Sequence, residues 1–297
     1  MIAIIMEVLL RNIPNDYLSK KKYLDQYSSE IETLILGNSH AHSGLNPEFF
    51  TNNTFNTGYV SQSLDLDYAI FKKYLSQLDN LKTVIVSISY PSLWAVLAET
   101  SESWRIKNYN IYYDLKTSRA LKYQTELFSS HFILHMTRLR SYYLENKPGI
   151  YSTPLGYGIN YQSGNPQDLT ATGESAAKRH EVKDLQSERV EALFQNNMDI
   201  LNALLSDCQQ RNIKVLFITV PAYRSYTGNL PAEPLEKTIA AMEHLTDVYD
   251  HCYYMNLLED DRFEDMHFFD ADHLNEIGAR KLSLIVDEII KSPAFYK

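Results

Sequence analysis

Small polar and ionisable residues follow an apolar run in the stretch LILGNSHAHSGLNP, residues 34–47. Asn38, Ser39 and His40 come directly after Gly37. A serine hydroxyl is a poor nucleophile at neutral pH until a neighbouring base accepts its proton. Taken alone, this stretch is consistent with a nucleophile, an anion-binding loop, a metal site or an ordinary helix cap.

A second group of such residues lies near the other end of the chain, in HFFDADHLNEIGARKLS. Asp270 stands three residues before His273, and a helical pattern follows. If both stretches lie at one edge of a sheet, His273 can accept the Ser39 proton, and Asp270 can orient the imidazole and stabilise its cation. Asp272 competes for this orienting role, and either aspartate would also suit a helix cap.

Alternating strand and helix patterns predict the framework that such a site needs. Amphipathic helical periods separate a series of short apolar runs. Apolar strands that alternate with helices are typical of a parallel sheet covered on both faces. We therefore predict an α/β protein with a three-layer α/β/α fold, whose ligands bind beyond the carboxyl ends of the strands. The predicted strands are 32–37, 53–58, 81–90, 213–220 and 252–257.

Residues 98–185 break this alternation. The first half of the segment has a helical pattern, whereas 148–173 has no regular period and holds five of the ten glycines. A loop this long inside a compact domain is usually functional or disordered, so we expect a helical and loop insertion, or lid, over the carboxyl edge of the sheet. The predicted organisation is a helical segment, 1–30, followed by a single domain, 31–297.

The first ten residues, MIAIIMEVLL, are apolar apart from Glu7. They are too few to cross a bilayer, which takes about 20 residues, and they lack the basic region and cleavage site of a signal peptide. The stretch is either a packed helix or the end of a membrane helix that begins outside this sequence. Membrane association through a missing or truncated N-terminal helix is therefore one expectation.

Composition limits the class of protein. The 297 residues include 44% apolar and 22% charged residues, as in a globular protein. A formal charge of −9 argues against a nucleic-acid partner. Cys208 and Cys252 lie in apolar contexts and are predicted to be buried free thiols. The 22 tyrosines suit sugar-binding grooves, but also a scatter over half-buried surface.

Two short blocks together resemble the SGNH (GDSL-type) hydrolase superfamily. They are ILGNSH near the start of the chain and DADHLN near its end. The resemblance covers the sheet-forming segments, roughly 30–97 and 186–291, and implies a flavodoxin-like sheet. It also implies that Ser39 is the nucleophile, Asp270 the orienting acid and His273 the base.

The two middle blocks of the superfamily match less well. Its Asn-x-Gly-x-x-Gly block resembles residues 56–61, which places the oxyanion glycine at Ser61. Its Gly-x-Asn-Asp block should follow the third strand, where the chain reads SISYPSLW and has no asparagine. The resemblance is thus to a divergent, envelope-associated branch that includes polysaccharide O-acetyltransferases and O-acetylesterases. The expected oxyanion residues are Ser39, Ser61, Asn38 and Gly58.

Further polar and aromatic residues follow the strands. Tyr90, Trp94, Tyr223 and Arg224 are candidates for substrate binding, although core packing or a solvated surface would explain them equally well. His40 and His42 form a His-x-His pair that suggests a metal-dependent hydrolase as a third reading. We do not predict a metal, because this pair is expected in a turn rather than on one face of a strand. We predict no cofactor, and a phosphate loop is disfavoured because its glycine motifs are missing.

The sequence therefore predicts a serine-dependent esterase or O-acyltransferase. Its expected partner is a small-molecule or polysaccharide acyl ester, with a carbohydrate O-acetyl group as the first choice. The alternative is a catalytically weak or inactive SGNH-like domain that binds glycans of the cell envelope. The expected location is the cell envelope, either extracytoplasmic or membrane-anchored, with the cytoplasm as the alternative.

Overall fold

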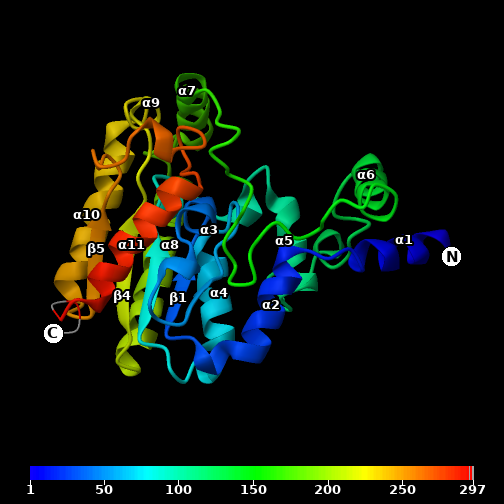
Figure 1. Ribbon diagram of the computed structural model, residues 1–297, viewed down its shortest axis with the longest axis horizontal. Helices are drawn as coiled ribbons and strands as arrows, with labels where there is room; N and C mark the ends of the chain where they lie inside the picture. Colours follow the sequence, from blue (N-terminus) through cyan, green and yellow to red (C-terminus); the bar gives the residue numbers. More distant parts are fainter. Residues whose placement is uncertain (294, 296–297) are drawn as a thin grey trace.

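Five parallel strands form one sheet at the centre of the computed structural model, which describes residues 1–293 and 295 (Figure 1). The strand order is β2-β1-β3-β4-β5, the flavodoxin-like order. This confirms the predicted three-layer α/β/α fold with a large insertion after the third strand. The strands are β1 (Thr33–Leu36), β2 (Thr54–Asn56), β3 (Thr83–Ser87), β4 (Lys214–Thr219) and β5 (Cys252–Asn256).

Alternate residues of each central strand point to opposite faces of the sheet, and both faces are buried. In β3, Val84 and Val86 pack on one face, whereas Ile85 packs on the other. The first face is covered by α2 (Asp16–Tyr27), α4 (Leu64–Tyr74), α8 (Glu188–Gln210) and α10 (Ala232–Val248). The second face is covered by α3 (Ser39–Gly44) and α11 (Glu276–Lys291).

The remaining helices lie outside these layers or at their edge. They are α1 (Ile2–Arg11), α5 (Ile106–Ile111), α6 (Phe132–Tyr143), α7 (Leu169–His180) and α9 (Arg224–Thr227). Short 3-10 helices complete the connections: η1 (Ser28–Glu30), η2 (Pro47–Phe49), η3 (Leu75–Gln77), η4 (Ser92–Trp94), η5 (Leu97–Glu99), η6 (Ser103–Arg105), η7 (Leu121–Tyr123) and η8 (Asp265–His267). Within residues 1–293 and 295, none of the helices combines the length and the apolar character needed to cross a bilayer.

The insertion differs from its sequence pattern in two places. Its first half is less helical than predicted, since only α5, α6 and short 3-10 turns form there. The end of the aperiodic part, 148–173, is helical, and α7 begins there at residue 169. Asp168 caps that helix by accepting hydrogen bonds from the N–H groups of Thr170 and Ala171. Gly173 lets it pack tightly, since a Cβ there would lie 2.2 Å from the Ser225 hydroxyl. Tertiary contact, rather than periodicity, sets this helix.

Candidate active site

The turn that leaves β1 is shaped by Gly37. Its φ of +133° lies in a region that side chains disfavour, and a Cβ there would come within 2.8 Å of the Ser87 Cβ. The chain can therefore pass close to β3 and enter α3 at Ser39. Asn38 caps that helix, because its side-chain oxygen accepts a hydrogen bond from the N–H of His40 at 3.0 Å.

Ser39, His273 and Asp270 form one chain of hydrogen bonds. The Ser39 Oγ lies 2.9 Å from the His273 Nε2. The His273 Nδ1 lies 3.0 and 3.2 Å from the two carboxylate oxygens of Asp270. Because an ionised carboxylate only accepts hydrogen bonds, Nδ1 carries the imidazole proton and Nε2 is free to accept the Ser39 proton. The structure thus brings together the three residues predicted as nucleophile, base and orienting acid.

Asp270 also fixes the loop that carries His273. Its Oδ1 accepts the backbone N–H groups of Asp272, at 2.9 Å, and of His273, at 2.8 Å. Burial alone would raise the pKa of this carboxyl, but the hydrogen bond and the charge of His273 hold the pKa below its usual value. Asp270 therefore stays ionised while it orients the imidazole.

Asp272 supplies a second carboxylate on the other side of the base. It is 1% exposed, and its Oδ1 accepts a hydrogen bond from the His40 Nε2 at 2.9 Å. Its Oδ2 lies 3.8 Å from the His273 Nε2 and makes no hydrogen bond within the described residues. Burial lowers the pKa of His273, but the charge of Asp272 and the hydrogen bond to Asp270 outweigh it, so the pKa is raised. Asp272 thus acts electrostatically, whereas Asp270 orients.

The His-x-His pair does not converge on one site. His42 turns to the other side, where its Nδ1 lies 3.3 Å from the Lys20 Nζ. His40, Asp272 and His273 do offer ligand atoms within 4.8 Å of one another. Their hydrogen bonds to each other and to Ser39 account for this proximity.

The sequence predicts that the backbone N–H groups of Ser39 and Ser61 bind the oxyanion. Ser39 begins α3, so its N–H has no partner within the helix. Ser61, at the position of the family glycine, has a φ of +59°, and it lines the same cavity as Ser39. Its hydroxyl donates a hydrogen bond to the Glu102 carboxylate. A serine there therefore keeps the left-handed backbone that the glycine of the block would adopt.

Gly58 does not serve as an oxyanion donor, contrary to the sequence prediction. Its N–H donates to the Asn56 Oδ1 at 2.9 Å. Its carbonyl oxygen accepts a hydrogen bond from the buried Lys20 ammonium of α2 at 2.5 Å. Gly58 is therefore a structural part of the loop that leads to Ser61.

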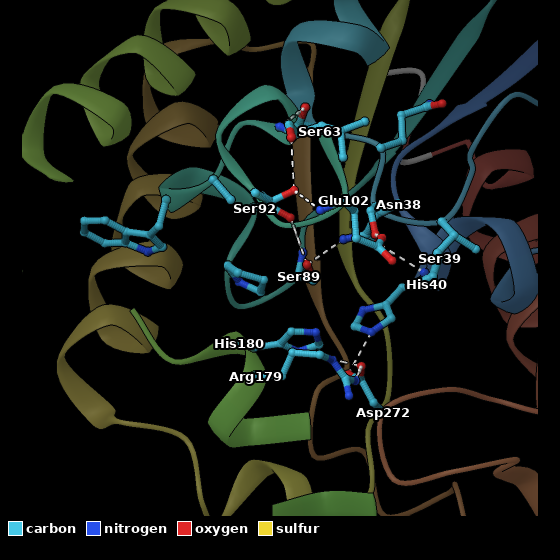
Figure 2. A pocket seen from close by; sticks show the side chains of 18 of the residues that line it. Asn38, Ser39, His40, Ser63, Ser89, Ser92, Glu102, Arg179, His180 and Asp272 are labelled. Atoms are coloured by element: carbon cyan, nitrogen blue, oxygen red, sulfur yellow. Dashed lines mark hydrogen bonds and ion pairs between the residues drawn. The ribbon is translucent and has the colours of Figure 1, made fainter. Parts of the chain in front are cut away.

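The side chain of Asn38 is held by the serines that follow β3. Its side-chain amide donates to the Ser89 Oγ at 2.7 Å, and that oxygen lies 3.0 Å from the Ser92 Oγ (Figure 2). Ser89 thus stands near the position of the missing third-block asparagine and holds Asn38 in place. The carboxamide has a second N–H, so the predicted oxyanion role of Asn38 stays a prediction.

A cavity of about 640 Å³ opens in front of Ser39 and His273. One part of its wall is rich in serine hydroxyls, and another is apolar. The insertion supplies much of the rim, which includes Glu102, Tyr161, Arg179 and His180. The serines are Ser61, Ser63, Ser87, Ser89, Ser92 and Ser101, and the apolar residues include Leu64, Trp94, Leu97, Val182 and Val190.

Only one of the four predicted substrate-binding residues lines this cavity. Trp94 does so, although it is 5% exposed and its Nε1 donates to the Thr238 hydroxyl at 3.1 Å. Tyr90 is buried in the core, with 2% exposure. Tyr223 packs against Phe268. Arg224 lies over the Tyr223 ring. Tyr90, Tyr223 and Arg224 are not among the residues that line the cavity, so these three predictions are wrong for it.

Sequence reasoning missed the residues that the insertion delivers to the site. Tyr161 packs against the His273 ring, with centroids 4.7 Å apart. Arg179 and His180 approach the Asp272 Oδ2 at 3.9 and 3.7 Å (Figure 2). Burial lowers the pKa of His180 to about 4, so this imidazole is neutral at pH 7. Only the length of the aperiodic stretch indicated that it faces the site.

Comparisons with known proteins give distant structural likenesses. No family model matches the chain, and no curated protein matches it. A Bacteroides fragilis structure, provisionally described as an acylhydrolase, has 11% identity and a TM-score of 0.42, covering 91% of this chain and 95% of its own. A GDSL-like lipase from Bacteroides thetaiotaomicron has 11% identity and a TM-score of 0.43, covering 93% and 98%. A Streptococcus pneumoniae structure, provisionally described as a platelet-activating factor, has 9% identity and a TM-score of 0.46, covering 97% and 97%.

Proposed function

We propose that this protein is a serine-dependent ester hydrolase or acyltransferase of the SGNH type. The observation that carries the proposal is the hydrogen-bonded chain from Ser39 through His273 to Asp270 at the mouth of a cavity. A nucleophile, a base and an orienting acid in this geometry define acyl-transfer chemistry irrespective of the fold that presents them.

In the first half of the reaction, the Ser39 Oγ attacks the ester carbonyl carbon while its proton moves to the His273 Nε2. The carbonyl oxygen becomes an oxyanion, which the N–H groups of Ser39 and Ser61 stabilise. The tetrahedral intermediate then breaks the bond to the alcohol oxygen. The alcohol leaves with the proton from His273, and the acyl group stays on Ser39.

In the second half, His273 accepts a proton from water or from a sugar hydroxyl, whose oxygen attacks the acyl carbon. Collapse of the new intermediate returns the proton to Ser39 and releases an acid or a new ester. The two negative carboxylates flanking His273 stabilise its cation in both halves, because each half passes through the protonated imidazole.

For the substrate we propose an acylated carbohydrate, with an O-acetyl group as the first candidate. The serine hydroxyls and the carboxylate of Glu102 in the cavity wall are groups that pair with sugar hydroxyls. The SGNH-like sequence blocks support the same choice, since the branch they resemble includes enzymes of polysaccharide O-acetylation.

The first test is Ser39→Ala assayed with p-nitrophenyl acetate and with an O-acetylated oligosaccharide. We expect kcat to fall about 10⁴-fold or more, as when a triad nucleophile is removed. Ser43→Ala is the matched control, because its hydroxyl bonds the Ser39 carbonyl on the same short helix and takes no part in the chemistry. Equal activity of Ser39→Ala and the unmutated chain would exclude the mechanism.

A second candidate is a catalytically silent domain that binds envelope glycans. The stretch SISYPSLW favours it, because it contains no asparagine where the superfamily block has its side-chain oxyanion donor. A fluorophosphonate probe separates the two candidates. Covalent labelling of Ser39 supports the enzyme, whereas glycan binding without labelling supports the silent domain.

A further inference from the structure

Exposed apolar side chains gather on one part of the molecule, which we name the α1–α6 lobe (residues 1–11 and 115–150). Figure 1 shows α1 and α6 next to each other, to the side of the sheet, and the two helices are in contact. Ile133 is 76% exposed and Leu144 is 77% exposed. The other exposed members are Met1, Ile2, Ile4, Ile5, Val8, Leu9, Leu121, Phe128, Phe132, Leu134, Met136, Tyr143 and Ile150.

In α1 the usual orientation of an amphipathic helix is reversed. Its polar residues face the protein, since the Glu7 carboxylate accepts the N–H groups of Glu126, at 3.0 Å, and Leu127, at 2.9 Å. Arg11 donates to the carbonyl oxygen of Gln124 at 2.8 Å. The apolar residues of α1, apart from the buried Leu10, point mostly to solvent. A surface helix normally buries its apolar stripe and exposes its charges.

The segment beneath α6 also directs its charged and polar groups toward the protein interior. Glu126 is 0% exposed, and its carboxylate pairs with the Lys107 ammonium and with the Arg138 guanidinium. The Tyr112 hydroxyl donates to it at 2.6 Å. The buried His135 ring contacts the carbonyl oxygens of Leu127 and Ser130, both at 3.1 Å. These polar contacts anchor the lobe and leave its apolar surface outward.

One face of α6 combines apolar residues with a cation. Ile133, Met136, Arg140 and Leu144 recur at helical spacing and are all exposed. A long cationic side chain beside apolar residues can lie along an apolar phase while its head reaches a polar one.

The lobe is basic although the whole chain is acidic. Residues 115–148 contain six Lys and Arg against two Glu, whereas the chain as a whole has a formal charge of −9. Both glutamates are already paired, Glu126 internally and Glu145 with Arg140 and Lys147. Within the described residues, no carboxylate lies in ion-pair range of the exposed Lys116, Arg119 or Lys122. An outward apolar surface with excess positive charge complements an anionic interface.

We propose that the α1–α6 lobe docks on the surface of an anionic lipid bilayer, with α1 and α6 lying in the interface. Their exposed apolar residues enter the boundary between headgroups and acyl chains, and the basic residues contact the lipid phosphates. This docking does not depend on the acyl-transfer chemistry, because it uses none of the residues of the cavity.

The test is co-sedimentation of the full-length protein with vesicles of phosphatidylcholine, with and without phosphatidylglycerol. We expect binding to the anionic vesicles that weakens as salt is added. Ile5→Ser combined with Ile133→Ser should lower binding on the order of tenfold or more, because two buried apolar anchors are lost. Arg119→Glu combined with Lys122→Glu should lower it while leaving the apolar surface intact.

The matched control is Val248→Ser on α10, since Val248 is 56% exposed and Ile5 is 52% exposed. This change should leave vesicle binding unaltered. Three results would overturn the proposal: no binding to either vesicle, equal binding to neutral and anionic vesicles, or a dimer in solution that Ile5→Ser with Ile133→Ser dissociates. The last result would assign the surface to self-association instead.

Discussion

The rim of the sheet and the α1–α6 lobe use charged groups in opposite ways. At the rim, the ionisable side chains of Asp272 and His273 line a cavity, and Asp270 is hydrogen-bonded to His273. In the lobe, the carboxylate of Glu126 turns inward and pairs with the buried Lys107 of α5, and apolar residues form the outer surface. Buried charge can therefore serve chemistry in one region and anchoring in another, and only its surroundings distinguish the two.

Because of this difference, loss of a charge should have different effects in the two regions. A charge lost at the rim should alter the reaction and leave the fold largely intact, whereas a charge lost beneath the lobe should loosen the lobe and spare the reaction. Three substitutions, two of them each with a companion variant, examine this contrast.

The largest effect is expected from Glu126→Gln. The charges of Lys107 and Arg138 outweigh burial and lower the pKa of Glu126 to about 2. Removing the carboxylate leaves these cations without their buried partner, which should lower the free energy of unfolding of the lobe by about 3–5 kcal/mol. Hydrogen exchange in residues 1–11 and 115–147 should accelerate, while turnover of p-nitrophenyl acetate stays within about threefold.

Glu145→Gln is the control for this prediction. Glu145 also pairs with two cations of the lobe, but these pairs are exposed to solvent, so the loss of Glu145 should change stability much less than the loss of Glu126. Equal effects of the two substitutions, or a large loss of turnover in Glu126→Gln, would contradict the separation between lobe and rim.

An intermediate effect is expected from Asp272→Asn. His273 must be neutral to accept the Ser39 proton, so activity falls as the pH drops through the raised pKa of His273. Without the Asp272 charge that pKa decreases, and the acid limb of the kcat/KM profile should move to lower pH. The rate at the optimum should fall by roughly tenfold, because the imidazolium formed during the reaction loses a counter-charge.

Asp67→Asn tests whether the acid limb of the kcat/KM profile reflects the pKa of His273 or that of Asp67. Asp67 is a second buried carboxyl in the cavity wall, where burial raises its pKa to about 7. It accepts hydrogen bonds from the N–H of Gly37 at 2.7 Å and from the Gln62 amide at 2.6 Å. If the limb moves in Asp67→Asn and not in Asp272→Asn, the assignment to His273 is wrong.

The smallest effect is expected from Ser61→Gly. Glycine accepts the φ of +59° without strain, but the hydrogen bond to Glu102 is lost, so the free energy of unfolding should change by less than about 1 kcal/mol. Turnover should stay within about threefold, since the proposed donor is the backbone N–H. A hundredfold loss, measured by steady-state kinetics with the same ester, would instead give the hydroxyl a direct part in the reaction.

The meeting of Ser39 and His273 was predictable from two local patterns and one topological rule, whereas the choice of Asp270 as the orienting acid was implied by the resemblance to the SGNH hydrolases. Gly37 and Ser39 end an apolar strand, and Asp270 and His273 precede a helix. The parallel sheet then brings both segments to its carboxyl edge. The separate role of Asp272 was not predictable, because sequence spacing does not determine which of two nearby carboxylates faces the Nδ1 of the base.

The position of the insertion in the chain was predictable from the sequence, but its secondary structure and contacts were not. Arg179 and His180 reach the cavity because α7 is capped by Asp168 and packs against Ser225 through Gly173, and none of these contacts leaves a period in the sequence. The apolar pattern of α1 was visible, but a pattern of this kind does not determine which face the protein covers. That face is set by polar contacts with residues more than a hundred positions away.

The bond from Lys20 to Gly58 has a consequence for where this protein can be divided. The ammonium of Lys20 holds the peptide that leads to Ser61, so α2 is tied directly to the loop at the site. A shortened chain starting at residue 31 would lose this internal tie. It would retain all five strands and Ser39, His273 and Asp270. It would lack the Lys20 ammonium that holds the Gly58 carbonyl oxygen, and with it the support of the loop that leads to Ser61.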